Sequence, residues 1–297
     1  MCRSGAGLHA GGRCSEHGRS PLPRRLRTIW ISDVHLGTRD AKAEALLDFL
    51  RHHESETLYL VGDLVDGWVL RRSWYWTQAH NDVVQKLLRK ARKGTRVVFV
   101  PGNHDEFARA YAGHSFGGIE VVLDAMHRTA DGRLLWVVHG DAFDPVLTKH
   151  RWLVPLAHGF LSLLRWAHVP TAWRFLRPAL GRPYRSLAAL VRSRANAAMA
   201  ALGDFERLAT AEARRRGADG VVCGHVHVPA MRTVDGTLYL NDGDWVETCS
   251  ALVEHDDGRL EIVRWTPVPP PSATVRARRK ERVAAFEPVL AAAGRVH

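Results

Sequence analysis

The sequence predicts an α/β fold built in layers, with a helical insertion and a basic tail at each end. Between residues 28 and 100, short apolar segments of strand length alternate with segments of helical periodicity, which is typical of a layered α/β domain. From residue 119 onward most segments have the character of strands, and between 145 and 203 this strand pattern disappears. The expected folded domain therefore spans 28–265 and is interrupted by an insertion at 145–203.

The first half of the domain is predicted to alternate strands and helices. Two short apolar runs end directly at Asp33 and at Gly62-Asp63, as buried strands do when they reach a loop. Apolar residues at helical spacing lie between the runs, and Gly94 is placed to end the second helix. The expected elements are, in order, strand 28–32, helix 41–50, strand 57–61, helix 74–91 and strand 96–100.

The second half is predicted to consist mainly of strands joined by tight turns. Asp-Gly pairs at 131–132, 235–236 and 257–258 are strong hairpin signals. Within the insertion, three prolines divide the helical spacing into short helices, and 186–216 has the pattern of a longer helix that returns to the domain. The expected strands are 119–123, 126–129, 134–138, 220–223, 230–234, 238–240, 250–254 and 260–265.

The charge of the chain is strongly positive and unevenly distributed. Lys and Arg number 42 against 31 Asp and Glu, which gives a net charge of +11. The surplus lies in two tails, 1–27 and 266–297, which we expect to lack a fixed fold, and in the insertion, which has nine Lys or Arg and no acid. Such an excess attracts nucleic acid, anionic lipid or phosphorylated substrates. Because an apolar signal segment is lacking and the four cysteines form no C-x-x-C pair, we expect a cytoplasmic protein with reduced thiols.

Residue types that bind metal ions follow five of the expected strands directly. They form the blocks Asp33-x-His35, Gly62-Asp63, Gly102-Asn103-His104-Asp105, His139-Gly140-Asp141 and Gly224-His225-Val226-His227. Ligands gather at the carboxyl ends of strands in layered α/β sheets, so these loops are expected to converge. Imidazole and carboxylate groups favour Mn, Fe, Zn or Co over Ca. Two such ions about 3.5–4 Å apart can activate water and clamp a phosphoryl group.

The five blocks, in this order, resemble those of the calcineurin-like metallophosphoesterases. The resemblance implies a four-layer α/β/β/α sandwich and two divalent ions, Mn being the first expectation. One ion would be held by Asp33, His35, Asp63 and His227, and the other by Asp63, Asn103, His139 and His225. His104 would be the acid or the contact to the phosphoryl oxygen, with Asp105 orienting its ring. Two roles are compatible with the sequence for Asp66 and Asp141: each could contact the site, or each could serve in a turn.

A narrower resemblance covers about residues 28–265. The segments Gly62–Asp66 and Asn241–Glu247, together with the insertion, resemble the UDP-2,3-diacylglucosamine pyrophosphatases. That family implies cleavage of a lipid-linked UDP-sugar to UMP and a lipid sugar phosphate, at the inner face of the bacterial inner membrane. The insertion would then be a cap for the acyl chains, and its candidate sugar and pyrophosphate contacts are Lys149, Arg151, Arg182 and Arg185. At His104 the well-characterised members have Arg, so this chain looks like a divergent relative of that family.

Other functions fit parts of the same pattern. The metal-ligand blocks alone are equally compatible with another phosphodiester, a phosphomonoester or a nucleotide as substrate. A basic nucleic-acid-binding protein or nuclease is suggested only by the net charge, and the chain has no recognised nucleic-acid module. A catalytically inactive scaffold would require lost ligand residues, and none is lost. The insertion itself could be a packed helical subdomain with a solvated basic face, and the oligomeric state is left open.

Overall fold

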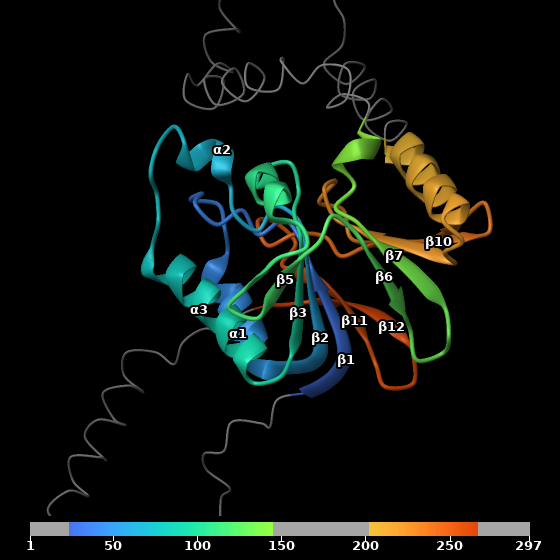
Figure 1. Cartoon of the computed structure of the whole chain (residues 1–297), viewed down its shortest axis with the longest axis horizontal. Coiled ribbons are helices and arrows are strands. Elements are labelled where there is room, and N and C mark those ends of the chain that lie inside the picture. Colours follow the sequence, from blue (N-terminus) through green and yellow to red (C-terminus); the bar gives the residue numbers. More distant parts are fainter. Residues whose placement is uncertain (1–23, 145–201, 267–297) are drawn as a thin grey trace, which may run out of the picture.

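Two facing β-sheets form the centre of the computed structural model, which describes residues 24–144 and 202–266 (Figure 1). Its elements, in which η denotes a 3₁₀ helix, are β1 (Arg24–Ile31), α1 (Ala43–His52), β2 (His53–Val61), α2 (Gly67–Leu70), α3 (Gln78–Arg92), β3 (Arg96–Val100), η1 (Glu106–Tyr111), β4 (Ser115–Phe116), β5 (Ile119–Val121), β6 (Ala125–Arg128), β7 (Leu134–Val137), η2 (Asp141–Phe143), β8 (Gly220–Cys223), β9 (Ala230–Val234), β10 (Thr237–Asn241), β11 (Ser250–Glu254) and β12 (Leu260–Arg264). At the start of the second described range, residues 202–215 are helical.

Each sheet has a parallel centre. The larger sheet has the strand order β12-β11-β1-β2-β3-β5-β4, and β1, β2, β3 and β5 are parallel to one another. The smaller sheet has the order β6-β7-β8-β10-β9, with β7, β8 and β10 parallel. Parallel strands end at the same edge of their sheet, so the loops that follow them can form one site.

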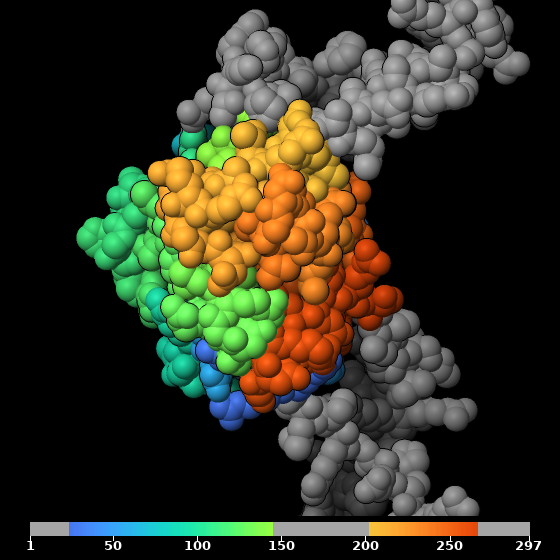
Figure 2. Space-filling model, turned by 90° about the vertical axis from the view of Figure 1, so that its right-hand side faces the viewer, coloured from blue at the N-terminus to red at the C-terminus, as the bar shows by residue number. Residues whose placement is uncertain are grey.

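Side-chain alternation along the strands creates three apolar layers. On β1, Trp30 faces the space between the sheets, where it belongs to the same buried cluster as Leu135 and Val222. Its neighbours Ile29 and Ile31 face the opposite way and pack with α1 and α3. On the far side, the helix through 202–215 packs on the smaller sheet, and Figure 2 shows this helix at the surface of that face. The predicted four-layer α/β/β/α arrangement is therefore confirmed.

The predicted strand bounds are largely correct, with one instructive error. Strands 96–100, 220–223, 230–234 and 250–254 have the predicted bounds. However, β1 and β2 each begin four residues earlier than predicted, at Arg24 and His53, because these two residues are already paired in the parallel ladder. Ion pairs such as Arg25–Glu56 give the polar side chains of these added strand residues partners on the neighbouring strand. The tail predicted at 1–27 therefore extends too far, since 24–27 belong to β1.

The helix predicted at 74–91 also begins later than expected. The Thr77 side chain accepts the backbone N–H of His80, and this capping box starts α3 at Gln78. Residues 1–23, 145–201 and 267–297 lie outside the described ranges, and so do most of the predicted insertion and nearly all of both tails. Of the helices in the described ranges, none combines the length and the apolar character needed to cross a bilayer.

Candidate metal centre

Loops from both sheets meet at one point of the structure. The larger sheet contributes the loops after β1, β2 and β3, and the smaller sheet contributes those after β7 and β8. These loops carry the seven residues that the sequence assigns as metal ligands, namely Asp33, His35, Asp63, Asn103, His139, His225 and His227. The backbone N–H of His225 donates to Asp33 Oδ2 (2.9 Å) across 192 positions of sequence. The sequence prediction that the five blocks converge is confirmed.

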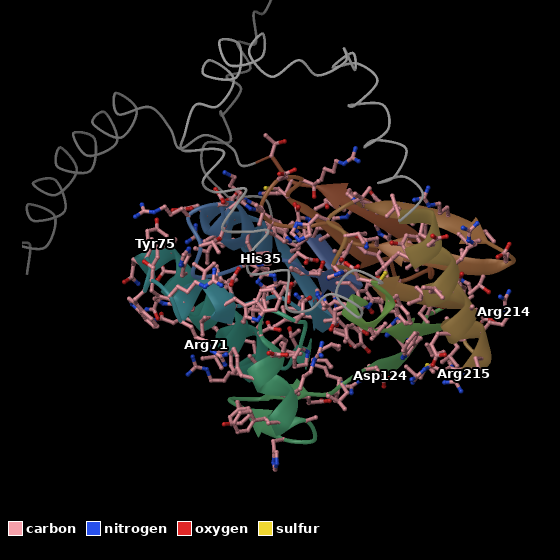
Figure 3. The ribbon with its side chains drawn as sticks, turned by 90° about the horizontal axis from the view of Figure 1, so that it is seen from above. His35, Arg71, Tyr75, Asp124, Arg214 and Arg215 are labelled. Atoms are coloured by element: carbon pink, nitrogen blue, oxygen red, sulfur yellow. The ribbon has the colours of Figure 1, made fainter. Side chains whose placement is uncertain are left out.

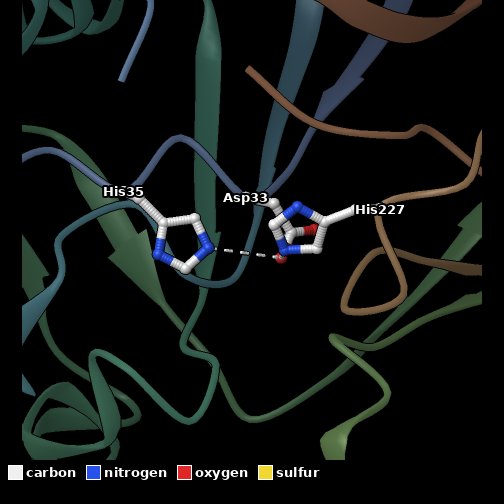
Figure 4. Close-up of side chains that lie close together, drawn as sticks. All are labelled: Asp33, His35 and His227. Atoms are coloured by element: carbon white, nitrogen blue, oxygen red, sulfur yellow. Dashed lines mark ion pairs between the residues drawn. The ribbon is translucent and has the colours of Figure 1, made fainter. Parts of the chain in front are cut away.

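The first cluster consists of Asp33, His35 and His227 (Figure 4). Asp33 Oδ1 lies 3.2 Å from His227 Nε2 and 3.9 Å from His35 Nε2. Asp33 is fully buried, and its other oxygen, Oδ2, accepts a hydrogen bond from the Ser32 hydroxyl. Three donor atoms for a metal ion therefore face one another at the end of β1.

The second cluster is built around Asp63. Its Oδ2 atom lies 3.4 Å from His139 Nε2 and 3.9 Å from His35 Nε2. The Asn103 Oδ1 atom lies 3.2 Å from the same His139 nitrogen. Asp63 thus stands between the ligand groups of the two sheets, in the place that a shared carboxylate would occupy.

Three of the histidines are oriented by their second ring nitrogen. The Nδ1 atom of His35 contacts Asp66 Oδ2 (3.2 Å), and that of His227 contacts Asp244 Oδ2 (2.9 Å). His139 Nδ1 lies 2.9 Å from the Val61 carbonyl oxygen. Because an N–H at Nδ1 satisfies each of these oxygens, the Nε2 lone pairs are directed into the clusters, as in known carboxylate–histidine–metal arrangements.

The donor set fits a divalent cation. Among the described residues, Asp33 Oδ1 and His35 Nε2 are buried without a hydrogen-bond partner, a state that is costly unless another group satisfies them. Two ligands each about 2.1 Å from one ion are separated by about 3 to 4 Å. The separations of 3.2–3.9 Å around Asp33 and Asp63 lie within that range. These residues can therefore share a cation without rearrangement of the loops.

The clusters also have the charge that a cation requires. Burial opposes ionisation of Asp63, but the neighbouring His139 outweighs it and holds the pKa of this carboxyl well below its usual value. Burial likewise opposes charging of His227, yet Asp244 and Asp33 raise its pKa to about 10. The carboxylates thus remain ionised and attract positive charge. A divalent ion would compete with protons for the same imidazole nitrogens.

Backbone conformation is unusual at the ligand positions. Seven non-glycine residues of the described ranges have positive φ, and five of them are ligand candidates: Asp33, His35, Asp63, His225 and His227. Such conformations cost free energy and persist where the surroundings impose them, typically at functional sites. At Gly102, a Cβ would overlap the Asp63 carboxylate and the His139 ring, so the loop tolerates no side chain there. The glycines beside the ligands are therefore explained by close approach.

The structure corrects one predicted role. Asp105 does not orient the His104 ring, because its carboxylate accepts the backbone N–H groups of Gly102 (2.6 Å) and Leu64 (2.7 Å) and so ties two ligand loops together. Instead, Asp66 Oδ2 lies 3.0 Å from His104 Nδ1. The Asp66 Oδ1 atom accepts the Val69 N–H at the start of α2. Asp66 therefore contacts a histidine of the site and also serves in the turn, the two roles that the sequence offered as alternatives.

His225 and two further acids complete the site. The Nε2 atom of His225 lies 3.1 Å from Asp144 Oδ2. Its ring centroid is 5.3 Å from that of His139. Asp141 pairs with Arg109 through both carboxylate oxygens (2.8 and 2.9 Å) and has a structural contact there. The sequence did not identify Asp144 or Asp244 as partners of the histidines. The substrate contacts Lys149, Arg151, Arg182 and Arg185 lie outside the described residues.

Replacing Asp66 with asparagine should lower kcat/KM about 10–100-fold. Asparagine can still cap α2, but it removes the charge that holds Nδ1 of both His35 and His104. Hydrolysis of an aryl phosphodiester and a metal titration would be measured on the same sample. The surface variant Asp204→Asn, which loses a pair with Arg207, is the control. Unchanged kcat/KM in Asp66→Asn would contradict the orienting role.

Comparisons of the chain with known proteins identify a family and several relatives. Residues 26–229, a range that includes every ligand candidate, match the model of the calcineurin-like phosphoesterase family. A UDP-2,3-diacylglucosamine hydrolase of Xanthomonas campestris pv. campestris is 30% identical over 251 residues, which are 78% of this chain and 97% of that protein. The enzyme of the same name from Azotobacter vinelandii is 33% identical over 122 residues, covering 39% of this chain and 48% of its own. Among solved structures, the E. coli phosphoesterase Yfce covers 80% of this chain and 99% of its own, with 16% identity and a TM-score of 0.39.

Proposed function

This chain belongs to the calcineurin-like phosphoesterases, and from that premise we propose that it hydrolyses the pyrophosphate of UDP-2,3-diacylglucosamine. The products would be UMP and a lipid monosaccharide phosphate. The broader activity is that of a metal-dependent phosphoester hydrolase. The specific substrate is supported by relatives that carry the name UDP-2,3-diacylglucosamine hydrolase, one of which is matched over 97% of its length.

The two clusters would hold two divalent ions. In this proposal Asp33, His35, Asp63 and His227 bind one ion, and Asp63, Asn103, His139 and His225 bind the other. The observation that carries it is the position of Asp63 Oδ2, which faces Nε2 of both His35 and His139. Ions bound there supply Lewis-acid activation of water and neutralise charge on the phosphoryl oxygens. The imidazole and carboxylate ligands suit Mn, with Fe, Zn and Co as alternatives.

The proposed role of His104 is to handle a proton at Nε2. Burial disfavours its charged form, but the Asp66 contact at Nδ1 and the charge of Asp63 raise the pKa of His104 above its ordinary value. An imidazolium held in this way at neutral pH can donate its Nε2 proton to the departing oxygen. The peptide N–H of His104 donates to Asp63 Oδ1 (2.8 Å), which holds the backbone of His104 beside the second cluster.

The lipid part of the proposal is based on the insertion and the relatives. Residues 145–203 carry nine basic side chains and no acid, and Lys149, Arg151, Arg182 and Arg185 are the proposed sugar and pyrophosphate contacts. Apolar residues at the helical spacing predicted from the sequence, together with cations, suit a glycolipid at an anionic membrane surface. We therefore propose peripheral association with the cytoplasmic face of the inner membrane. The alternative favoured by His104, in place of the expected Arg, is another phosphodiester substrate.

The deciding experiment incubates purified, Mn-loaded protein with UDP-2,3-diacylglucosamine and measures UMP. Asp63→Asn is the inactive control, and bis(4-nitrophenyl) phosphate is a second substrate. UMP formation by the wild type alone would support both the metal centre and the lipid substrate. Hydrolysis of the aryl diester without any UMP would support the metal centre and contradict the lipid assignment. Inactivity of the Mn-loaded wild type toward both substrates would contradict the whole proposal.

A further inference from the structure

A short helical turn beside the metal centre carries cations that the proposed ion sites do not use. In α2, the Trp68 indole lies over the His104 ring, with centroids 4.1 Å apart and planes at 32°. Helical hydrogen bonding continues past α2, because the N–H of Arg71 donates to the Gly67 carbonyl (3.2 Å). Residues three and four apart share one face of a helix, so Arg71 and Arg72 lie on the same face as Trp68.

This face is fixed to the loops that carry the ligands. The Gly67 N–H donates to the His104 carbonyl (3.0 Å), and the Asp66 N–H donates to the Leu36 carbonyl (2.8 Å). Beyond α2, the Arg39 guanidinium lies 4.6 Å from the centre of the Tyr75 ring and links the loop after β1 to the segment before α3. The position of the face relative to both clusters is therefore set by backbone contacts.

Arg71 and Arg72 are exposed and have no carboxylate partner among the described residues. Other arginines near the rims of the sheets are paired, for example Arg109 with Asp141 and Arg216 with Glu212 and Asp124. Viewed from above, Arg71 lies on the same side of the molecule as His35, and Arg214 and Arg215 lie at the other end (Figure 3). Two adjacent unpaired guanidinium groups repel each other, and a phosphate that accepts hydrogen bonds from both removes this cost.

We propose that Arg71 and Arg72 bind the second phosphate of a diphosphate-containing substrate, next to the phosphoryl group that is attacked. This inference rests on the proposed function, because it takes the two clusters as the place of the attacked group. A helical rise of 1.5 Å per residue places the two arginines about 4.5 and 6 Å beyond Trp68 along the axis. Trp68 covers His104, so the metal centre and the arginine pair form neighbouring subsites. The pair would make the enzyme selective for pyrophosphate diesters over compounds with one phosphate.

The test is competitive inhibition of bis(4-nitrophenyl) phosphate hydrolysis by the full-length, Mn-loaded enzyme. Methylenediphosphonate is the inhibitor with two phosphorus groups and inorganic phosphate the one with a single group, both at a fixed free Mn²⁺ concentration. In Arg71→Gln/Arg72→Gln, the Ki of methylenediphosphonate should rise about tenfold or more, while the Ki of phosphate stays within about twofold. The control Arg89→Gln/Arg92→Gln removes two exposed cations from the last turn of α3 and should change neither constant.

Each outcome decides the proposal. A selective rise in the Ki of methylenediphosphonate supports the second-phosphate subsite. Equal changes for both inhibitors, or none for either, would overturn it, and an equal effect in the α3 control would indicate general electrostatics instead. Because the assay uses an aryl phosphodiester, a failure of the UMP assay leaves this test intact. The arginine pair and the lipid substrate can therefore be refuted separately.

Discussion

Asp63→Asn is expected to reduce hydrolysis of any phosphoester by at least about a thousandfold, because loss of a shared ligand removes several kcal/mol of charge stabilisation. The side chain is almost fully buried, and its Oδ2 atom faces Nε2 of His35 and His139. The asparagine side chain ends in an amide, and its N–H groups can point to the position where both clusters require a negatively charged oxygen. Because asparagine has nearly the same shape as aspartate, the loss of activity would come from the missing negative charge and the missing metal coordination.

The measurement pairs kcat on bis(4-nitrophenyl) phosphate with the metal content of the same preparation. Bound metal should fall below two ions per chain in Asp63→Asn, while circular dichroism remains that of the wild type. Asp131→Asn, which alters an exposed carboxylate paired with Arg133, is the control for charge alone. If Asp63→Asn retained a tenth of wild-type turnover, the shared-ligand assignment would be wrong.

His104→Gln is expected to lower kcat by about 10²–10⁴-fold, the range typical of a general acid. Its Nε2 atom lies 3.9 Å from Asp63 Oδ2, and its Nδ1 contacts Asp66. His104, His35 and Asp63 are close enough for a cation to contact all three, so the ligand role and the acid role need separate tests.

The leaving group separates these two roles. An acid assists a poor leaving group more than a good one, so the loss in His104→Gln should be larger for an alkyl ester than for the 4-nitrophenyl ester. Metal content should stay at the wild-type value. A drop in bound metal, with the same loss for both esters, would make His104 a ligand and overturn its assignment as the acid.

The convergence of the candidate ligands was predictable because each follows a strand within a few positions. Asp33 comes directly after a buried apolar run, and His225 follows the run at 220–223 closely, so a local pattern places both at the edge of a sheet. The identity of the block, such as Gly-Asn-His-Asp, then restricts the chemistry. The fold class and the place where the candidate ligands meet are for this reason predictable from short segments.

The partners of those ligands were not predictable in the same way. Asp244 reaches His227 from the loop after β10, and Asp144 reaches His225 from the end of η2, 81 positions away. No local spacing connects these pairs, and only the pairing of β7, β8 and β10 side by side in the smaller sheet brings their loops together. The role of Asp105 was wrong for a related reason, because backbone N–H groups of another loop compete for its carboxylate.

The early parts of β1 and β2 show the same limit for secondary structure. Arg24, Arg25 and Arg27 have the composition of a polar tail, and yet they pair with β2 and with acids of β11 and β12. Local propensity does not contain that information, because the extent of a strand within a sheet is defined by the strands on either side of it.

The hydrogen bond from His225 to Asp33 has a consequence for biosynthesis. The first ligands leave the ribosome long before His225 and His227 are translated, since 192 positions separate the two bonded residues. A nascent chain that has formed only β1 to β3 presents buried carboxylates without their later imidazole partners. Such distant pairings form slowly compared with local ones. Activity would therefore require that the loop after β8 has been made and has packed beside the end of β1.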